Sequence, residues 1–329
     1  MGQDKAHWRA QKERASGFWQ MKFMLGTYRL FGTKRLRVII YPIVFCFYAF
    51  APKVRKLSRK FLTRAAIHAG KPLPSRMDPF RHVVSFAYSM IEKIAAWSGD
   101  VDLDRINFHE DDVRSLIARL EDGKGAVVIC SHVGNMELLR ALATHDKTRV
   151  SRKFMVTSIV DFSGTAKFNR LIEEISPESM MHLVSAKDMG VDTVLDLHAR
   201  LERGELLVIA GDRTSSTAPD KVEEVSFLGE DAEFPQGAFI LASLMDAPVY
   251  FMFGVREDDL DPVSPYDLRV FKAATEFTGS RKERRAKIRA IVTEYVLLLE
   301  RFVGEHPLQW YNFYDFWNKA KENKENKKK

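Results

Sequence analysis

The sequence has few of the residues from which disulfide and metal sites are built. Only two of its 329 residues are cysteines, Cys46 and Cys130, which is too few for a disulfide framework, and no Cys-x-x-Cys or Cys/His cluster predicts zinc. Both cysteines lie in apolar runs, so we expect reduced residues of the core type. The chain also lacks a His-Glu-x-x-His helix, a Walker loop and a Gly-x-Ser-x-Gly turn. These absences argue against zinc peptidases, P-loop nucleotide hydrolases and α/β-hydrolases.

The apolar run near the N-terminus is short for a membrane span. Residues 38–51 are uncharged, and as a helix they extend about 21 Å, against a hydrocarbon core of roughly 30 Å. Pro42 would kink such a helix, and cationic residues flank the run on both sides. The pattern favours a shallow or re-entrant insertion from the cytoplasmic side over a simple span. A buried helix of the main fold is the alternative, and no cleavable signal peptide is evident.

Positive charge is concentrated at the two ends of the chain. Residues 1–64 hold 15 Lys and Arg against 2 acidic residues, and residues 319–329 hold 6 Lys against 2 Glu. Residues 65–318 are therefore acidic, with 30 basic and 40 acidic residues. Basic ends on an acidic body suit an anionic membrane better than nucleic acid. We expect a basic, membrane-associating helical segment (1–64), one α/β domain (65–318) and a disordered Lys-rich tail (319–329).

Short apolar runs of the buried-strand type alternate with amphipathic helical patterns along the body. This alternation predicts an α/β fold in which a central, mostly parallel or mixed sheet is flanked by helices. Asn107 and Glu110 resemble a capping box, which predicts the start of a helix. The strand-like segments 222–228 and 266–273 are expected to pair at an edge. Further helices are predicted at 80–97, 136–144, 165–175, 190–203, 236–246 and 281–303.

The stretch CSHVGNMELL (130–139) follows one of the predicted buried strands. His132 lies two residues past the apolar run, where functional groups collect in such sheets. Residues five apart on one helix point about 140° apart, so His132 reaches Glu137 only if the chain bends between them. Gly134 permits that bend, and Asn135 is a suitable N-cap for a helix beginning at Met136.

Glu137 would then hold one ring nitrogen of His132 and leave the other free as a general base. The alternative is an ordinary polar turn into a helix, because a His-x₄-Glu spacing alone is a weak signal.

Three other stretches combine polar residues with turns. In LLVIAGDRTSS, Asp212 and Arg213 suit the binding of an anionic or polar head group, or form a solvated turn. In AKFNRLIEEI, Arg170 either meets a phosphate or lies on a solvent face. In FLGEDAEFPQGAF, Pro235 and Gly237 indicate either close approach of a ligand to the backbone or a tight loop.

Taken together, these stretches resemble the lysophospholipid acyltransferase superfamily, in particular the branch of bacterial lipid A (late) acyltransferases. The resemblance covers most of residues 5–318. It is carried, in order, by SHVGNMELL, FNRLIEEI, VIAGDR, FLGEDAEFPQGAFILA and QWYNFYDFW. It implies that His132 is the general base and Glu137 its partner. It also implies substrate-binding residues, the last two near the acyl pocket: Asn135, Arg170, Asp212, Arg213, Phe234 and Gly237.

One departure concerns the acceptor. The loop AGDRTSS stands where glycerol-phosphate acyltransferases have Phe-Pro-Glu-Gly-Thr, which argues against glycerol phosphate.

The resemblance implies a membrane-associated acyltransferase at the cytoplasmic face of a bacterial inner membrane. It would move an acyl chain from acyl carrier protein or coenzyme A to a hydroxyl or amine of a lipid or glycolipid. The thioester is then a co-substrate, no metal or organic cofactor is needed, and nucleic acid is not a partner. A thioesterase on the same fold and a non-catalytic lipid-binding protein are the alternatives.

Overall fold

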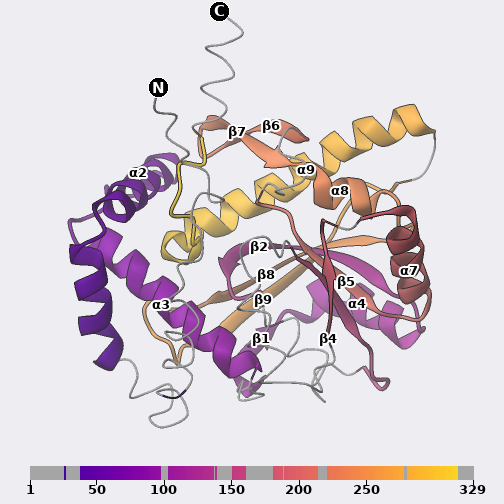
Figure 1. Cartoon of the computed structure of the whole chain (residues 1–329), viewed down its shortest axis with the longest axis horizontal. Coiled ribbons are helices and arrows are strands. Elements are labelled where there is room, and N and C mark those ends of the chain that lie inside the picture. The colour runs from indigo at the N-terminus through magenta and orange to yellow at the C-terminus, as the bar shows by residue number, and fades with distance from the viewer. Residues whose placement is uncertain are drawn as a thin grey trace, which may run out of the picture.

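The protein has a central sheet with helices on both of its faces, which confirms the predicted α/β class (Figure 1). The structure is a computed structural model that describes Gly26, Leu138 and the ranges 38–97, 103–136, 150–160, 181–187, 189–213, 221–277 and 280–317.

The central sheet is mostly parallel, as predicted. Its described strands have the order β1-β9-β8-β2-β5-β3-β4. The strands β8, β2, β5, β3 and β4 run parallel, whereas β9 is antiparallel to β8 and parallel to β1. The bounds are β1 (Ile106–Phe108), β2 (Ala126–Gly134), β3 (Val156–Val160), β4 (Met181–Ser185), β5 (Leu206–Ala210), β8 (Val249–Arg256) and β9 (Tyr266–Lys272).

The described helices include α2 (Pro52–His68), α3 (Asp78–Trp97), α4 (Glu110–Glu121), α7 (Val191–Glu202), α8 (Gly237–Ala242) and α9 (Arg281–Glu305). Of these, α3, α7 and α9 lie within two residues of their predicted bounds, and α8 ends earlier than predicted. Short 3₁₀ turns occur at η2 (Leu103–Arg105) and η5 (Pro307–Gln309). The helix predicted at 165–175, and most of the one at 136–144, lie outside the described residues.

Each face of the sheet has its own hydrophobic core. Val113, Leu116 and Leu120 of α4 pack with β2, β5, β8 and β9 residues on one face. On the other face, α2, α7, α8, α9 and the aromatic C-terminal segment share a larger core. Because β2 is covered on both sides, all of its residues are buried except His132, which is partly exposed. This explains why the strand is an apolar run rather than an alternating pattern.

The N-terminal helices form a unit at one side of the sheet (Figure 1). The helix Val38–Ala49 packs Ile40 and Val44 against α3, while much of its remaining apolar surface is exposed. Among the described residues no single helix has the length and apolarity of a membrane span. The helix Val38–Ala49 and α2 reach that length and apolarity only together, as a pair bent by 100°. Cys46 is exposed on this helix, so its prediction as a core cysteine is wrong.

The prediction of a capping box at Asn107 and Glu110 is also wrong. Asn107 does not cap a helix, because it lies in β1 and its Nδ2 donates to Glu257 Oε1 at 2.6 Å. The N-cap of α4 is His109, whose side chain makes no capping hydrogen bond. The Ser-x-x-Glu pattern that does form a capping box is Ser280 and Glu283, at the start of α9.

The strand-like segments 222–228 and 266–273 do not pair with each other. The first forms β6 (Val222–Phe227), which pairs with β7 (Glu230–Pro235) in a separate hairpin, and the second forms β9 of the main sheet. The hairpin turn has two residues, Leu228 and Gly229, both with positive φ. Such a turn suits the twist of adjacent strands, so β6 pairs with its nearest neighbour in sequence.

Candidate active site

The pairing of β2 with β5 brings His132 beside Asp212. These parallel neighbours are in register with Cys130 opposite Ala210, and each strand leads to a polar residue two positions further on. Since parallel strands end at the same edge of a sheet, the two side chains emerge at the same level. Two of the stretches singled out from the sequence therefore meet at one place.

His132 and Asp212 form two hydrogen bonds with each other. The ring Nδ1 of His132 lies 2.7 Å from Asp212 Oδ1, and the backbone N–H of His132 donates to Asp212 Oδ2 at 2.9 Å. The His132 side chain is 22% exposed, whereas that of Asp212 is 1% exposed. The pair therefore has a buried carboxylate and an imidazole that solvent or a ligand reaches.

The local charges favour an ionised Asp212 beside a neutral His132. Burial by itself raises the pKa of Asp212, but the hydrogen bonds from His132 and the charges of His132 and Arg213 lower it to about 2. Burial and the Arg213 charge lower the pKa of His132, against the opposing effect of Asp212. A carboxylate only accepts hydrogen bonds, so Nδ1 carries the ring proton and Nε2 has a free lone pair. This is the tautomer that a general base requires.

The bend predicted at Gly134 is present, but His132 does not leave the strand before it. Gly134 has φ +66°, and a Cβ there would lie 2.0 Å from the Gly254 carbonyl oxygen. β2 continues through His132 to Gly134 with a register irregularity against β8, and Val133 within this stretch pairs with Trp310 of the C-terminal segment. Glu137 lies outside the described residues, so its contact with His132 stays a prediction.

The predicted substrate-binding residues differ in their surroundings. Asn135 is buried and its side chain bonds to Tyr266. Arg213 follows Asp212 and donates to the Tyr311 carbonyl oxygen at 3.0 Å. Arg170 lies outside the described residues, and for all three residues substrate binding stays a prediction.

The two residues predicted near an acyl pocket belong to β7 and α8. The Phe234 ring is fully buried among aromatic rings, 5.4 Å from Phe227 and 5.2 Å from Phe316 between centroids. At Gly237, the first residue of α8, a Cβ would meet no described atom within 4 Å. Crowding therefore does not require a glycine at position 237, whereas Phe234 belongs to the hydrophobic core.

The aromatic C-terminal segment contributes to the site, a role that the sequence did not predict. Trp310 donates its indole N–H to Asp212 Oδ2 at 3.3 Å, and Tyr311 N–H donates to the His132 carbonyl oxygen at 3.4 Å. Tyr295 of α9 donates its hydroxyl to the Cys130 carbonyl oxygen at 2.9 Å. The end of β2 is therefore held by elements that lie far from it in the sequence.

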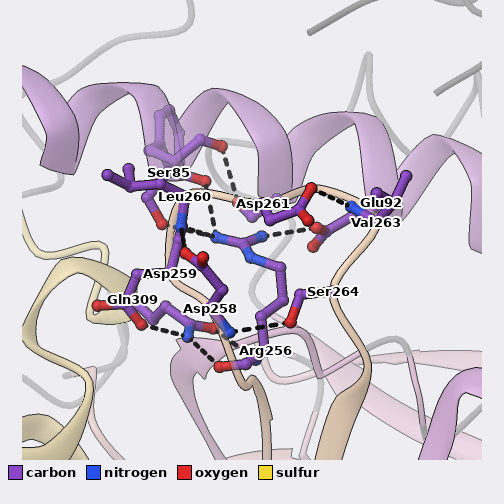
Figure 2. A network of polar contacts seen from close by, with 12 residues as sticks. Ser85, Glu92, Arg256, Asp258, Asp259, Leu260, Asp261, Val263, Ser264 and Gln309 are labelled. Carbon is purple, nitrogen blue, oxygen red and sulfur yellow. Dashed lines mark hydrogen bonds and ion pairs between the residues drawn. The ribbon is translucent and has the colours of Figure 1, made fainter. Parts of the chain in front are cut away.

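A buried polar network next to this site also went unpredicted (Figure 2). Arg256, the last residue of β8, pairs with Glu92 of α3 at 2.6 Å and donates to Ser85 Oγ at 2.6 Å. Its backbone exchanges two hydrogen bonds with the Gln309 side chain, at 2.9 and 2.8 Å. Arg256 thus connects the sheet to α3 through its guanidinium and to the C-terminal segment through its backbone, as Figure 2 shows. The feature of the sequence that could have indicated this network is Arg256 itself, a single charged residue at the end of an apolar strand.

Metal binding has no evident place among the residues that the structure describes. No group of three or more His, Cys, Asp or Glu side chains lies there in an arrangement that would hold a metal ion. Independently of metals, the His132 imidazole, with Asp212 on its Nδ1, is suited to proton transfer.

Comparison with known families identifies the family of the chain. No curated protein sequence matches the chain. A family model, described as bacterial lipid A biosynthesis acyltransferase, matches residues 12–319. That match covers nearly all of the chain, including both strand ends of the site and the C-terminal segment that closes over them. The chain thus belongs to the bacterial lipid A biosynthesis acyltransferase family, and it is an acyltransferase.

Proposed function

We propose that the protein moves an acyl chain from a thioester of acyl carrier protein or coenzyme A to a hydroxyl or amine of a lipid or glycolipid. The observation that carries this proposal is the His132–Asp212 pair. Its hydrogen bond of 2.7 Å fixes the ring proton on Nδ1, and its imidazole is the more exposed of the two groups. A base with this orientation needs no serine or cysteine nucleophile, since the acceptor supplies the attacking atom.

The proposed reaction is a direct displacement at the thioester carbonyl. His132 Nε2 takes the proton from the acceptor hydroxyl or amine while the oxygen or nitrogen attacks the carbonyl carbon. The tetrahedral intermediate then collapses, the carbon–sulfur bond breaks, and the leaving thiolate takes the proton from the imidazolium. The products are an ester or amide and a free thiol. Asp212 stabilises the imidazolium throughout, and Arg213 is the proposed cation for the developing oxyanion.

The test is acyl transfer by His132→Ala, compared with His109→Ala. His109 is a matched control because it also pairs with an aspartate, Asp267, but at an exposed position. Both variants are given acyl-coenzyme A or acyl carrier protein thioesters with a bacterial lipid extract, and acylated lipid is measured by mass spectrometry. We expect His132→Ala to abolish transfer and His109→Ala to retain it. Wild-type transfer by a folded His132→Ala protein would refute the assignment of the base.

The acceptor and the competing functions are tested by the products. Lipid mass spectrometry of cells with and without the gene names the acceptor through a mass difference of one acyl chain. Release of free fatty acid alone, in the presence of lipid, would instead identify a thioesterase. Vesicle binding without any thioester turnover, and indifferent to His132, would identify a non-catalytic lipid-binding protein.

We also propose that the protein acts at the cytoplasmic face of a bacterial inner membrane. Its N-terminal helices would insert into that membrane. On the helix Val38–Ala49 and just after it, Ile43 is 52%, Phe47 55% and Phe50 89% exposed. The following α2 begins with the basic sequence PKVRKLSRK. An exposed apolar surface followed by cations suits shallow insertion into an anionic bilayer.

Vesicle co-sedimentation tests this membrane proposal. The variant combines Ile43→Ser, Phe47→Ser and Phe50→Ser, and the control combines Val191→Ser and Leu195→Ser, which alter exposed apolar residues of α7. We expect the wild type and the control to bind anionic vesicles in a salt-sensitive manner, and the triple variant to lose most of this binding. Equal binding by the triple variant and the control would contradict a membrane role for this helix.

A further inference from the structure

The backbone of Trp310 is held between the N-terminal helices and the strand that carries His132. On one side Trp310 pairs with Val133 of β2 in an antiparallel bridge. On the other side, its carbonyl oxygen accepts a hydrogen bond of 3.0 Å from Nε2 of the buried His82, in α3. His82 Nδ1 in turn lies 2.9 Å from the Ser58 hydroxyl of α2. These contacts fix the main chain of Trp310 relative to the end of β2.

The Trp310 ring is fixed as firmly as its backbone. The residue is 1% exposed, and its ring lies against three phenylalanine rings at centroid distances of 5.0 Å (Phe61), 5.3 Å (Phe227) and 5.2 Å (Phe316). A buried tryptophan usually finds a partner for its indole N–H. Here that partner is Asp212 Oδ2, at 3.3 Å.

Asp212 thereby receives three N–H groups on its two oxygens. Oδ2 accepts from the indole of Trp310 and from the backbone N–H of His132 at 2.9 Å, and Oδ1 faces His132 Nδ1 at 2.7 Å. Two donors on Oδ2 from different segments determine the plane of the carboxylate. That plane decides whether Oδ1 points at the imidazole.

We propose that Trp310 is a positioning residue for the reaction, since its indole N–H holds the Asp212 carboxylate so that Oδ1 aligns with His132. This inference rests on the proposed function for its catalytic consequence. Trp310 does not touch the reacting atoms and acts through Asp212. The packing of its ring explains a large aromatic residue at this position, but it does not require an N–H group. The hydrogen bond to Asp212 is what a tryptophan adds.

Loss of the indole N–H has a defined expected effect. The carboxylate then keeps one donor on Oδ2 and turns more freely, so His132 loses part of the support that Asp212 gives to the imidazolium. The pKa of His132 falls further, and the acid limb of the kcat/KM profile moves to lower pH. We expect the plateau to fall roughly tenfold, the order expected for one hydrogen bond to a charged group.

The experiment compares Trp310→Phe with Trp317→Phe. Trp317 is a matched control because it is also buried, lies in the same aromatic cluster and donates its indole N–H to one acceptor, the Phe227 carbonyl oxygen at 3.2 Å. In addition, β-(3-benzothienyl)alanine is incorporated at position 310, which keeps the shape of the ring and replaces the N–H by sulfur. Readouts are the kcat/KM profile against pH and the His132 pKa measured by NMR without substrate.

We expect both changes at position 310 to lower the plateau and the His132 pKa, and Trp317→Phe to leave the His132 pKa at its wild-type value. Equal His132 pKa values in the benzothienyl protein and the wild type would overturn the proposal, as would equal effects of the two phenylalanine variants. The NMR readout needs no turnover, so it tests the inference even if the wild type fails to transfer acyl groups. That failure would refute the proposed function alone.

Discussion

Replacing Asp212 with asparagine is predicted to trap His132 in the wrong tautomer. Two N–H groups, from the His132 backbone and the Trp310 indole, point at the Oδ2 position. The amide oxygen of the new side chain therefore takes that position, and its NH₂ group faces His132 Nδ1. An N–H donor there requires Nδ1 to accept, so the ring proton moves to Nε2. The nitrogen that should take the acceptor's proton is then already protonated.

The magnitude follows from the loss of the base. In a Ser-His-Asp triad the same exchange leaves the geometry intact and lowers kcat by roughly 10⁴, equivalent to about 5 kcal/mol of transition-state stabilisation. We expect a loss of that order for Asp212→Asn, with KM nearly unchanged. The assay is thiol release together with acylated lipid, and ¹⁵N NMR reports the tautomer. A folded variant within tenfold of the wild-type kcat would show that Asp212 does not set the state of His132.

Three further predictions follow from individual contacts. The rate kcat/KM should rise with pH as His132 loses its proton, with a midpoint below 6.5, because burial and Arg213 lower the pKa; a pH profile at constant ionic strength checks this. Arg256→Met should cost about 3–5 kcal/mol, since it leaves Glu92 buried without its cation; urea unfolding measures the loss, and adding Glu92→Leu should recover part of it. His82 is neutral when folded because burial lowers its pKa to about 4. Stability should therefore fall by about 3 kcal/mol between pH 6.5 and pH 4, and His82→Gln should flatten that slope in unfolding experiments across this range.

The periodic part of the fold was predictable because it depends on local burial. β2, β5 and β8 are apolar runs covered on both faces, and α9 has apolar residues at helical spacing. The capping box was predicted wrongly because the side chain that fits a cap in sequence has a different hydrogen-bond partner in the fold. Asn107 fits a cap in sequence but lies in a strand, where Glu257, 150 residues away, takes its amide. Such a competitor is not visible in the local pattern.

The sequence singled out both residues of the candidate pair but not their pairing. His132 and Asp212 were each noted as a polar residue following an apolar run, His132 as a base and Asp212 as a binder of a polar head group. That they bond to each other depends on the strand order β2-β5, which skips β3 and β4 in the sequence and leaves no local signal. Trp310 was noted only as part of an aromatic segment. Its contact with Asp212 requires that segment to pair with β2 at Val133, far away in the sequence.

A carboxylate on Nδ1 limits how Glu137 takes part. An imidazole has two nitrogens, and with Asp212 on one and the acceptor on the other, neither is left for a second carboxylate. If Glu137 shares Nδ1 with Asp212, both residues act on one equilibrium, and the losses of kcat in Glu137→Gln and Asp212→Asn should be far from additive. If Glu137 instead binds the acceptor, the two losses should add, and Glu137→Gln should raise KM for the acceptor while leaving the His132 pKa in place. The double variant thus assigns the His-x₄-Glu spacing to the base or to the substrate.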